Sequence, residues 1–351
     1  MKRHGNLFQK VASIDNLIEA ERKARKGKKH QYGVMLFDKD KERLFQELRA
    51  LLLEKKFLTS VYTTFRIWEP KERIIFRLPY YPDRIVHHAI LNVVEEIFVS
   101  NFTADTYSCI KGRGIHGVLT AVQKALLDVD GTQYCLKLDI RKFYPSIDHD
   151  ILKKQLRRKF KDEDFLWMLD GIIDSTDGIP IGNYLSQYFA NFYLSGLDHW
   201  LKEKKKVKYY FRYADDIVIL SDNKEELHEL LSEIRKYLSD ELKLELKPNY
   251  QVFPVCSRGI DFVGYVIYHT HVRLRKTIKK RFARKVAIGI RDESWSAYEG
   301  WTKHCNSKHL MKKLTNERFQ TARNKDRRRR TRRKQNRNAG SIRQRDNSIR
   351  L

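Results

Sequence analysis

Apolar residues recur along the chain with two different spacings, which predicts a mixture of helices and strands. Over residues 1–60, apolar positions such as Leu44, Leu48 and Leu51 recur at helical spacing between Arg, Lys and Glu. Further helices are expected over residues 83–98, 118–127, 151–169 and 224–238, strands over 61–69, 74–79, 134–139 and 242–247, and a hairpin over 260–267. The chain is therefore expected to have an α+β fold.

Three aspartates stand at the ends of predicted strands. The run Phe211–Leu220 has apolar residues on both sides of Asp215 and Asp216, which is typical of a tight hairpin between buried strands. A lone Asp-Asp pair is more often an ordinary polar turn. However, the strand over 134–139 also ends in a carboxylate, Asp139, and carboxylates gathered at one sheet edge suit Mg²⁺. Two such ions about 4 Å apart would activate a 3′-hydroxyl and stabilise a leaving pyrophosphate.

These motifs resemble the palm of reverse transcriptases. Tyr213-Ala214-Asp215-Asp216 stands where that family has its Tyr-x-Asp-Asp box, Asp139 stands where it has its first metal-binding Asp, and the resemblance extends from about Lys71 to Leu310. It implies a right-hand polymerase architecture with fingers, a palm built as an antiparallel sheet backed by helices, and a helical thumb. The implied activity is RNA-directed DNA polymerisation, with Asp139, Asp215 and Asp216 as catalytic residues. The implied metal ligands of two Mg²⁺ ions are Asp139, Ile140, Asp215 and Asp216.

The resemblance also suggests which residues bind the incoming dNTP. A basic hairpin resembles the fingers, where Lys71, Arg73 and Arg77 are candidates to clamp the triphosphate, although each could equally be a solvated surface charge. Tyr144 lies where the family has an aromatic residue that packs under the sugar and excludes a 2′-hydroxyl. Lys247 corresponds to a lysine that could protonate pyrophosphate.

The block from Gly178 to Gln187 narrows the resemblance. Most reverse transcriptases carry Gln where Ile181 stands and Pro where Gln187 stands, and Gly182 at a strand-to-helix turn would allow close approach to a base pair. The Ile-Gly-x-x-x-Ser-Gln version is similar to the reverse transcriptases of diversity-generating retroelements. Ile181, Gly182 and Gln187 are therefore expected to contact the dNTP, and the loss of an amide implies low fidelity, with errors at template adenines.

Other residues are expected to contact the primer and template. Gly264 lies in a hairpin that resembles the primer grip, and the chain after His271 is basic, as a thumb along a heteroduplex would be. In this thumb, the aromatic residues around Trp295 and Tyr298 are expected to pack the helices. The full primer and template set is Lys111, Arg113, Tyr213, Gly264, Arg275 and Lys279.

Composition agrees with a nucleic-acid partner. The chain has 351 residues, 41% of them hydrophobic, and a formal net charge of +27, which favours a polyanion as partner.

Expected parts are fingers over 1–133, palm over 134–270, thumb over 271–320 and a basic, disordered RNA-binding tail over 321–351. Its four cysteines form no Cys-x-x-Cys pair, and no apolar run suits a membrane span or secretion signal, so a cytoplasmic location in a bacterium, archaeon or phage is expected.

The retroelement resemblance implies particular partners, and two other interpretations stay open. The implied partners are dNTPs, a structured template-repeat RNA with its RNA–cDNA duplex, and an oligomeric, small, basic accessory variability protein; no membrane partner is expected. The cDNA would serve mutagenic retrohoming. One alternative is a group II intron-like or otherwise domesticated reverse transcriptase of ordinary fidelity. The other is a maturase-like protein that binds RNA without catalysis, although the intact Asp139, Asp215 and Asp216 argue against it.

Overall fold

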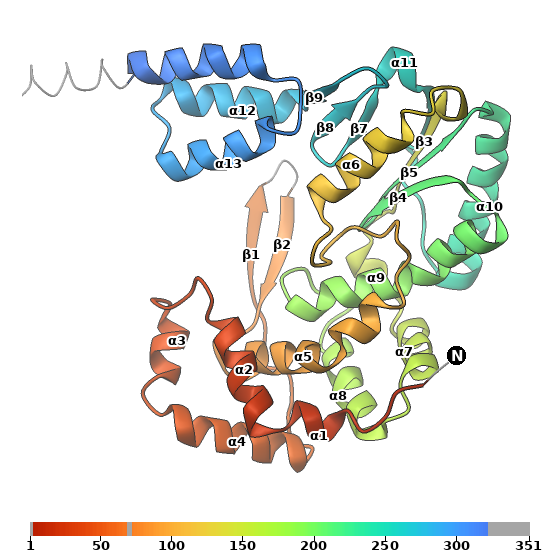
Figure 1. Cartoon of the computed structure of the whole chain (residues 1–351). Coiled ribbons are helices and arrows are strands. Elements are labelled where there is room, and N and C mark those ends of the chain that lie inside the picture. The colour runs from red at the N-terminus through yellow and green to blue at the C-terminus, as the bar shows by residue number, and fades with distance from the viewer. Residues whose placement is uncertain (1–2, 69–71, 322–351) are drawn as a thin grey trace, which may run out of the picture. The chain divides into compact units, whose positions relative to one another are not determined.

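The computed structural model describes residues 3–68 and 72–321, and the chain divides into two compact units, residues 1–254 and 255–351. The first unit begins with the helices α1 (Phe8–Val11), α2 (Ile14–Ala24), α3 (Tyr32–Phe37) and α4 (Lys41–Leu53), followed by a hairpin of β1 (Thr63–Trp68) and β2 (Glu72–Arg77) (Figure 1). Its later helices are α5 (Ile85–Val99), α6 (Ile115–Ala125), α7 (His149–Lys159), α8 (Glu163–Ile173), α9 (Tyr184–His199) and α10 (Lys224–Leu242). Short helical turns lie at Tyr80–Arg84, Asp130–Thr132, Tyr144–Ser146 and Trp200–Lys204.

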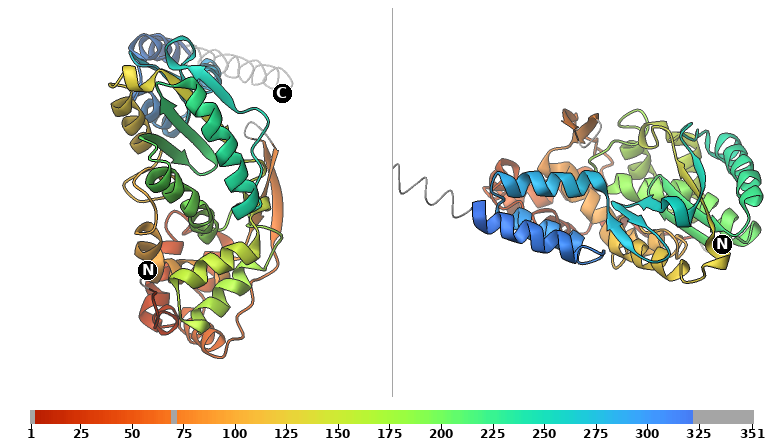
Figure 2. Two further views of the ribbon diagram at one scale, coloured as in Figure 1. Left: turned by 90° about the vertical axis from the view of Figure 1, so that its right-hand side faces the viewer. Right: turned by 90° about the horizontal axis from the view of Figure 1, so that it is seen from above.

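The first unit also contains a four-stranded sheet in addition to the β1–β2 hairpin. This sheet is antiparallel, with the order β4 (Tyr209–Tyr213), β5 (Asp216–Ser221), β3 (Tyr134–Asp139) and β6 (Gln251–Pro254). Because side chains alternate across a strand, Leu136, Leu138, Ile217 and Ile219 share one face. They belong to the same buried core as α9 and α10, and α10 runs along the sheet (Figure 2). The opposite face carries Lys137, Asp139 and Asp216 together with the buried Cys135, Val218 and Leu220.

Local polar residues set several helix boundaries. Asp148 caps α7, since its carboxylate accepts a hydrogen bond from the Ile151 N–H at 3.0 Å. The single helix predicted over 151–169 is wrong, because α7 ends before Phe160 and Asp162 caps a second helix, α8. The Asp162 carboxylate also accepts from the backbone N–H of Leu7 at 2.6 Å, so the break between α7 and α8 ties down the start of the chain.

The strand predicted over 242–247 is also wrong. Helix α10 continues to Leu242, and the Leu244 N–H closes its end by donating to the Leu238 carbonyl at 2.8 Å. The segment then meets the end of β3 only through an isolated bridge between Leu246 and Ile140. This bridge nevertheless brings the residues after Leu246 to the end of the strand that carries Asp139.

The second unit, considered by itself, combines a small sheet with helices. It contains α11 (Val255–Arg258), the antiparallel strands β7 (Ile260–Phe262), β8 (Tyr265–Ile267) and β9 (Val272–Leu274), and the helices α12 (Lys276–Ala287) and α13 (Asp292–Thr302), with residues 308–321 also helical. Phe282 stacks on Tyr298 with ring centroids 4.5 Å apart, and Trp295 belongs to the same small core. The expected role of these aromatic residues in helix packing is confirmed.

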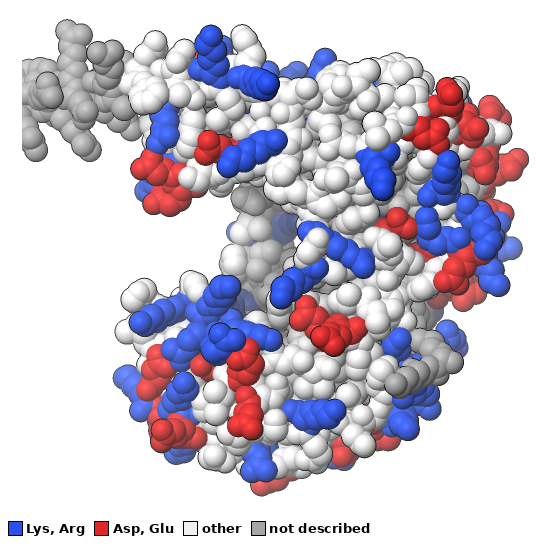
Figure 3. All heavy atoms as spheres, in the orientation of Figure 1, with Lys and Arg blue, Asp and Glu red and all other residues white. Residues whose placement is uncertain are grey.

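Two surface properties bear on partners. On the face drawn in Figure 3, Lys and Arg side chains gather over α2 and the loop that follows it, where the sequence runs Arg22-Lys-Ala-Arg-Lys-Gly-Lys-Lys29. No helix in the described part of the chain combines the length and apolar composition needed to span a bilayer.

Candidate active site

The β4–β5 hairpin brings two of the predicted aspartates to the end of β3. Ala214 and Asp215 form its turn, and Ala214 adopts a left-handed conformation with φ of 55°. In the antiparallel register Asp216 is directly opposite Asp139, so these two side chains share the face of the sheet opposite to Leu138 and Ile217. Asp139 is thus brought together with Asp215 and Asp216, which are distant from it in the sequence, at one end of adjacent strands.

The carboxylates of this cluster repel one another. Burial and the adjacent carboxylate of Asp139 raise the pKa of Asp215. The Asp215 carbonyl accepts a hydrogen bond from the Ile140 N–H at 3.4 Å, so the backbone holds this turn against the residue that follows Asp139. Lys137 lies on the same face, with Nζ 3.7 Å from Asp216 Oδ1. A divalent cation placed among these carboxylates would relieve their repulsion.

Lys247 occupies the position next to Asp139. Its Nζ is 2.5 Å from Asp139 Oδ1, and its backbone N–H donates to the Asp139 carbonyl at 2.8 Å. The described residues contain no ready-made group of three or more His, Cys, Asp or Glu ligands for a metal. The residues nevertheless fit Mg²⁺, because Asp139 and Asp215 offer adjacent oxygens and Lys247 is a cation that could exchange for it.

Tyr144 follows Asp139 by five residues and belongs to the turn Tyr144–Ser146. Burial raises the pKa of its hydroxyl, with further contributions from Cys109 and Asp215. Its carbonyl accepts from the Ile179 N–H at 2.9 Å, which joins it to the loop before α9. Tyr144 is therefore linked through its backbone to the loop predicted to contact the dNTP.

That loop follows a helix, so the predicted strand-to-helix turn is wrong. It runs from α8 to α9, and its Ile181 carbonyl accepts from the Phe76 N–H of β2 at 2.8 Å. Gly182 has φ of 125°, and a Cβ at that position would lie 2.3 Å from the Phe76 carbonyl oxygen. Glycine is thus required here by close approach of the β1–β2 hairpin, which positions the loop through a non-local contact.

The remaining residues of the dNTP set lie around this hairpin and on α9. Arg73 and Arg77 are exposed and share one face of β2, whereas Lys71 lies outside the described residues. Gln187 is exposed on α9 and lines a hollow together with Lys28 and Arg84.

The predicted primer and template residues of the first unit have different surroundings. Lys111 is exposed. Arg113 donates through Nη1 to the carbonyls of Thr103 and Thr106 at 2.7 and 2.8 Å, so it stabilises its own loop. Tyr213 is half-buried at the end of β4, and burial raises the pKa of its hydroxyl.

In the second unit, contacts within the unit account for the glycine at position 264. A Cβ there would lie 2.4 Å from the Trp301 ring, and the Gly264 carbonyl accepts from the Arg275 N–H at 2.9 Å. Arg275 pairs with Asp261 at 2.6 Å, and Lys279 is exposed on α12. Gly264 and Arg275 thus have structural partners within their own unit, and Lys279 is available to a ligand.

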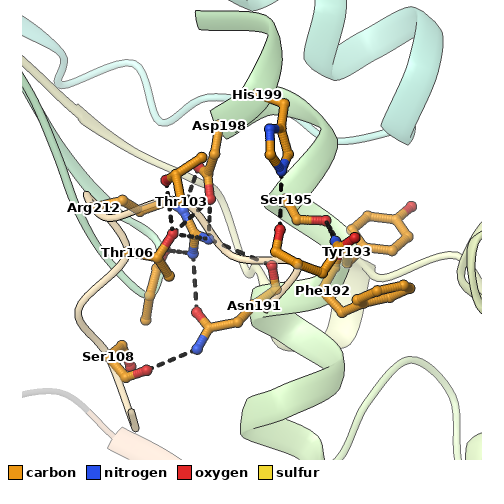
Figure 4. A network of polar contacts seen from close by, with 12 residues as sticks. Thr103, Thr106, Ser108, Asn191, Phe192, Tyr193, Ser195, Asp198, His199 and Arg212 are labelled. Atoms are coloured by element: carbon orange, nitrogen blue, oxygen red, sulfur yellow. Dashed lines mark hydrogen bonds and ion pairs between the residues drawn. The ribbon is translucent and has the colours of Figure 1, made fainter. Parts of the chain in front are cut away.

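A buried ion pair behind the hairpin was missed by the sequence analysis. Arg212 in β4 and Asp198 in α9 are both fully buried and joined by hydrogen bonds (Figure 4). In the sequence, an arginine inside the apolar run before Tyr213 indicates a buried charge. Its partner Asp198 lies on a different element, so no local sequence pattern identifies the pair.

Comparisons with known proteins identify relatives. A family model described as "Reverse transcriptase (RNA-dependent DNA polymerase)" matches residues 69–267. Protein YkfC of Escherichia coli (strain K12) is 25% identical over 72% of this chain and 81% of its own. The group II intron-encoded protein LtrA of Lactococcus lactis subsp. cremoris is 22% identical over 62% of this chain and 52% of its own. A telomerase from Candida tropicalis has a TM-score of 0.47 at 12% identity, over 70% of this chain and 55% of that one.

Proposed function

The chain belongs to the reverse transcriptase (RNA-dependent DNA polymerase) family, and from this premise we propose that Asp139, Asp215 and Asp216 form its polymerase active site. The observation that carries the proposal is the meeting of these carboxylates at one end of β3 and β5. Asp139, Asp215, Asp216 and the Ile140 backbone would hold two Mg²⁺ ions. When bound, the ions would activate a primer 3′-hydroxyl and offset charge on the dNTP phosphates.

The proposed mechanism assigns separate tasks to the surrounding residues. The primer oxygen bonds to the α-phosphorus of the dNTP, its proton is lost, and the bond from that phosphorus to the pyrophosphate leaving group breaks. Arg73, Arg77 and Lys71 would offset the triphosphate charge. Lys247, 2.5 Å from Asp139, could donate a proton to the departing pyrophosphate.

We assign the fingers to 1–133, the palm to 134–270, the thumb to 271–320 and an RNA-binding tail to 321–351. The boundary between the two compact units, after Pro254, falls inside the proposed palm. Within these parts, Lys111, Arg113, Tyr213, Gly264, Arg275 and Lys279 would contact the primer and template.

Tyr144 is proposed to exclude ribonucleotides. Besides burial, Asp215 contributes to the raised pKa of its hydroxyl, and we expect the 2′-hydroxyl of a nucleotide bound at the carboxylates to meet its ring. Tyr144→Ala is expected to lower the ratio of kcat/KM for dNTP to that for NTP by at least about tenfold. Tyr144→Phe, which keeps the ring, serves as the control. Single-nucleotide extension measures both ratios, and equal ratios for the Ala variant and the wild type would contradict the assignment.

We further propose that the enzyme makes error-prone cDNA for a diversity-generating retroelement. The support is Ile181 in place of an amide, with Gln187 exposed on the helix that follows. The proposed partners are a template-repeat RNA and an oligomeric basic accessory protein. A group II intron-like enzyme of ordinary fidelity is the second candidate, favoured by the similarity to LtrA.

Primer extension on a defined RNA template, followed by cDNA sequencing, tests this proposal. Errors concentrated at template adenines are expected, and Ile181→Gln should reduce them about tenfold by restoring an amide hydrogen bond. Ile181→Leu is the matched control and should leave the error rate unchanged. Accurate cDNA from the wild type, with and without the accessory protein, would instead support the intron-like candidate.

A further inference from the structure

A fully buried arginine lies directly behind the catalytic turn. Arg212 Nε and Nη2 donate to the two carboxylate oxygens of Asp198 at 2.7 and 2.5 Å, which forms a bidentate pair with no exposure on either side chain. The two opposite charges compensate each other within this pair. Because the pair uses Nε and Nη2, the third guanidinium nitrogen, Nη1, can donate to other groups.

That remaining nitrogen reaches the turn. Arg212 Nη1 donates to the Ala214 carbonyl at 3.1 Å and to Asn191 Oδ1 at 3.0 Å. The Ala214 carbonyl belongs to the peptide that precedes Asp215, and Ala214 is in the left-handed region with φ of 55°. The peptide that follows Asp215 is also held, because the Asp215 carbonyl accepts from the Ile140 N–H. Hydrogen bonds therefore restrain both peptide planes that flank Asp215.

The guanidinium has little freedom to move. Asp198 also accepts hydrogen bonds from the Tyr210 hydroxyl at 2.5 Å and from Thr106 Oγ1 at 2.9 Å, the second of which is drawn in Figure 4. Asn191 Nδ2 donates to the Ser108 carbonyl at 2.8 Å, so the same network joins α9, β4 and the loop before α6. A rigid donor at the base of the turn is the arrangement that fixes a catalytic side chain within a narrow range of directions.

We infer that Arg212 is a positioning residue, which orients Asp215 toward Asp139 by holding the Ala214 carbonyl. The inference rests on the proposed polymerase site. Asp198 and Asn191 hold the guanidinium in place, and Arg212 itself touches neither substrate nor reacting atoms. Second-layer hydrogen bonds of this kind fix the direction of a metal-binding side chain.

The test compares Arg212→Lys with Tyr193→Phe in the full chain. Lysine keeps the charge beside Asp198, but one ammonium group cannot replace a fork that spans Asp198 and Ala214. Tyr193→Phe removes a buried hydroxyl of α9 that donates to the Leu242 carbonyl at 2.6 Å, outside the Arg212 network. We expect Arg212→Lys to weaken Mn²⁺ binding, followed by electron paramagnetic resonance, and to lower kcat for primer extension, each by about 10–100-fold. Affinity for the RNA–primer duplex should stay unchanged, and Tyr193→Phe should resemble the wild type in both readouts.

Every outcome bears on the inference. If Arg212→Lys does not fold, Arg212→Met combined with Asp198→Leu removes both charges together and should show the same defects in Mn²⁺ binding and kcat. Mn²⁺ affinity and kcat equal to those of Tyr193→Phe would overturn the positioning role. If the wild type makes no cDNA, that result contradicts the proposed polymerase function but not the role of Arg212. The role of Arg212 is then tested by comparing the Mn²⁺ affinity of Arg212→Lys with that of the wild type.

Discussion

Replacing Asp215 by Asn is expected to lower the rate of cDNA synthesis by at least about 10³-fold, which corresponds to about 4 kcal/mol of lost transition-state stabilisation. The reason is that Asp215 and Asp139 supply adjacent carboxylate oxygens, and Asn removes one negative charge from that pair. Asn has nearly the same shape as Asp, so the turn should be preserved. Primer extension with Mg²⁺ on an RNA template measures the loss.

The matched control is Asp222→Asn. Asp222 is exposed one residue beyond β5, so the same chemical change on the same hairpin lies away from the carboxylate cluster. It should retain wild-type activity. Because the neutral side chain removes repulsion from Asp139, Asp215→Asn should also be at least as stable as the wild type in urea. Full polymerase activity in Asp215→Asn would exclude the proposed metal site.

Replacing Asp198 by Ala is expected to reduce the free energy of unfolding by about 3–5 kcal/mol. The change leaves the Arg212 guanidinium fully buried without its carboxylate and removes the acceptor of the Tyr210 and Thr106 hydroxyls. Removal of one partner from a buried pair is more destabilising than removal of both. Urea unfolding followed by circular dichroism measures the difference.

Glu47→Ala provides the comparison for this prediction. Glu47 pairs with Arg43 at 3.0 Å on the surface of α4, where both side chains are well exposed. Loss of this pair should change the free energy of unfolding by less than about 1 kcal/mol. Similar effects for Asp198→Ala and Glu47→Ala would mean that water reaches Arg212, contrary to its complete burial.

The sequence by itself determined the features that depend on neighbouring residues. Apolar runs on both sides of Asp215 and Asp216 predicted the hairpin, and the strand before Asp139 was found in the same way. The Asp148 cap of α7 is an interaction of the same local kind, because the carboxylate bonds an N–H only three residues away. These interactions are short in sequence, so the pattern of residue types contains them.

Tertiary structure decided the contacts between distant segments. Lys247 reaches Asp139 across 108 positions, and Arg212 finds Asp198 on a different element. The helix predicted over 151–169 divides because Asp162 also binds the start of the chain, a partner that helical periodicity cannot reveal. Likewise, the Ile181 carbonyl bonds to β2. Hydrophobic periodicity specifies which face of an element is buried, but the partner of a buried polar group depends on which elements pack together.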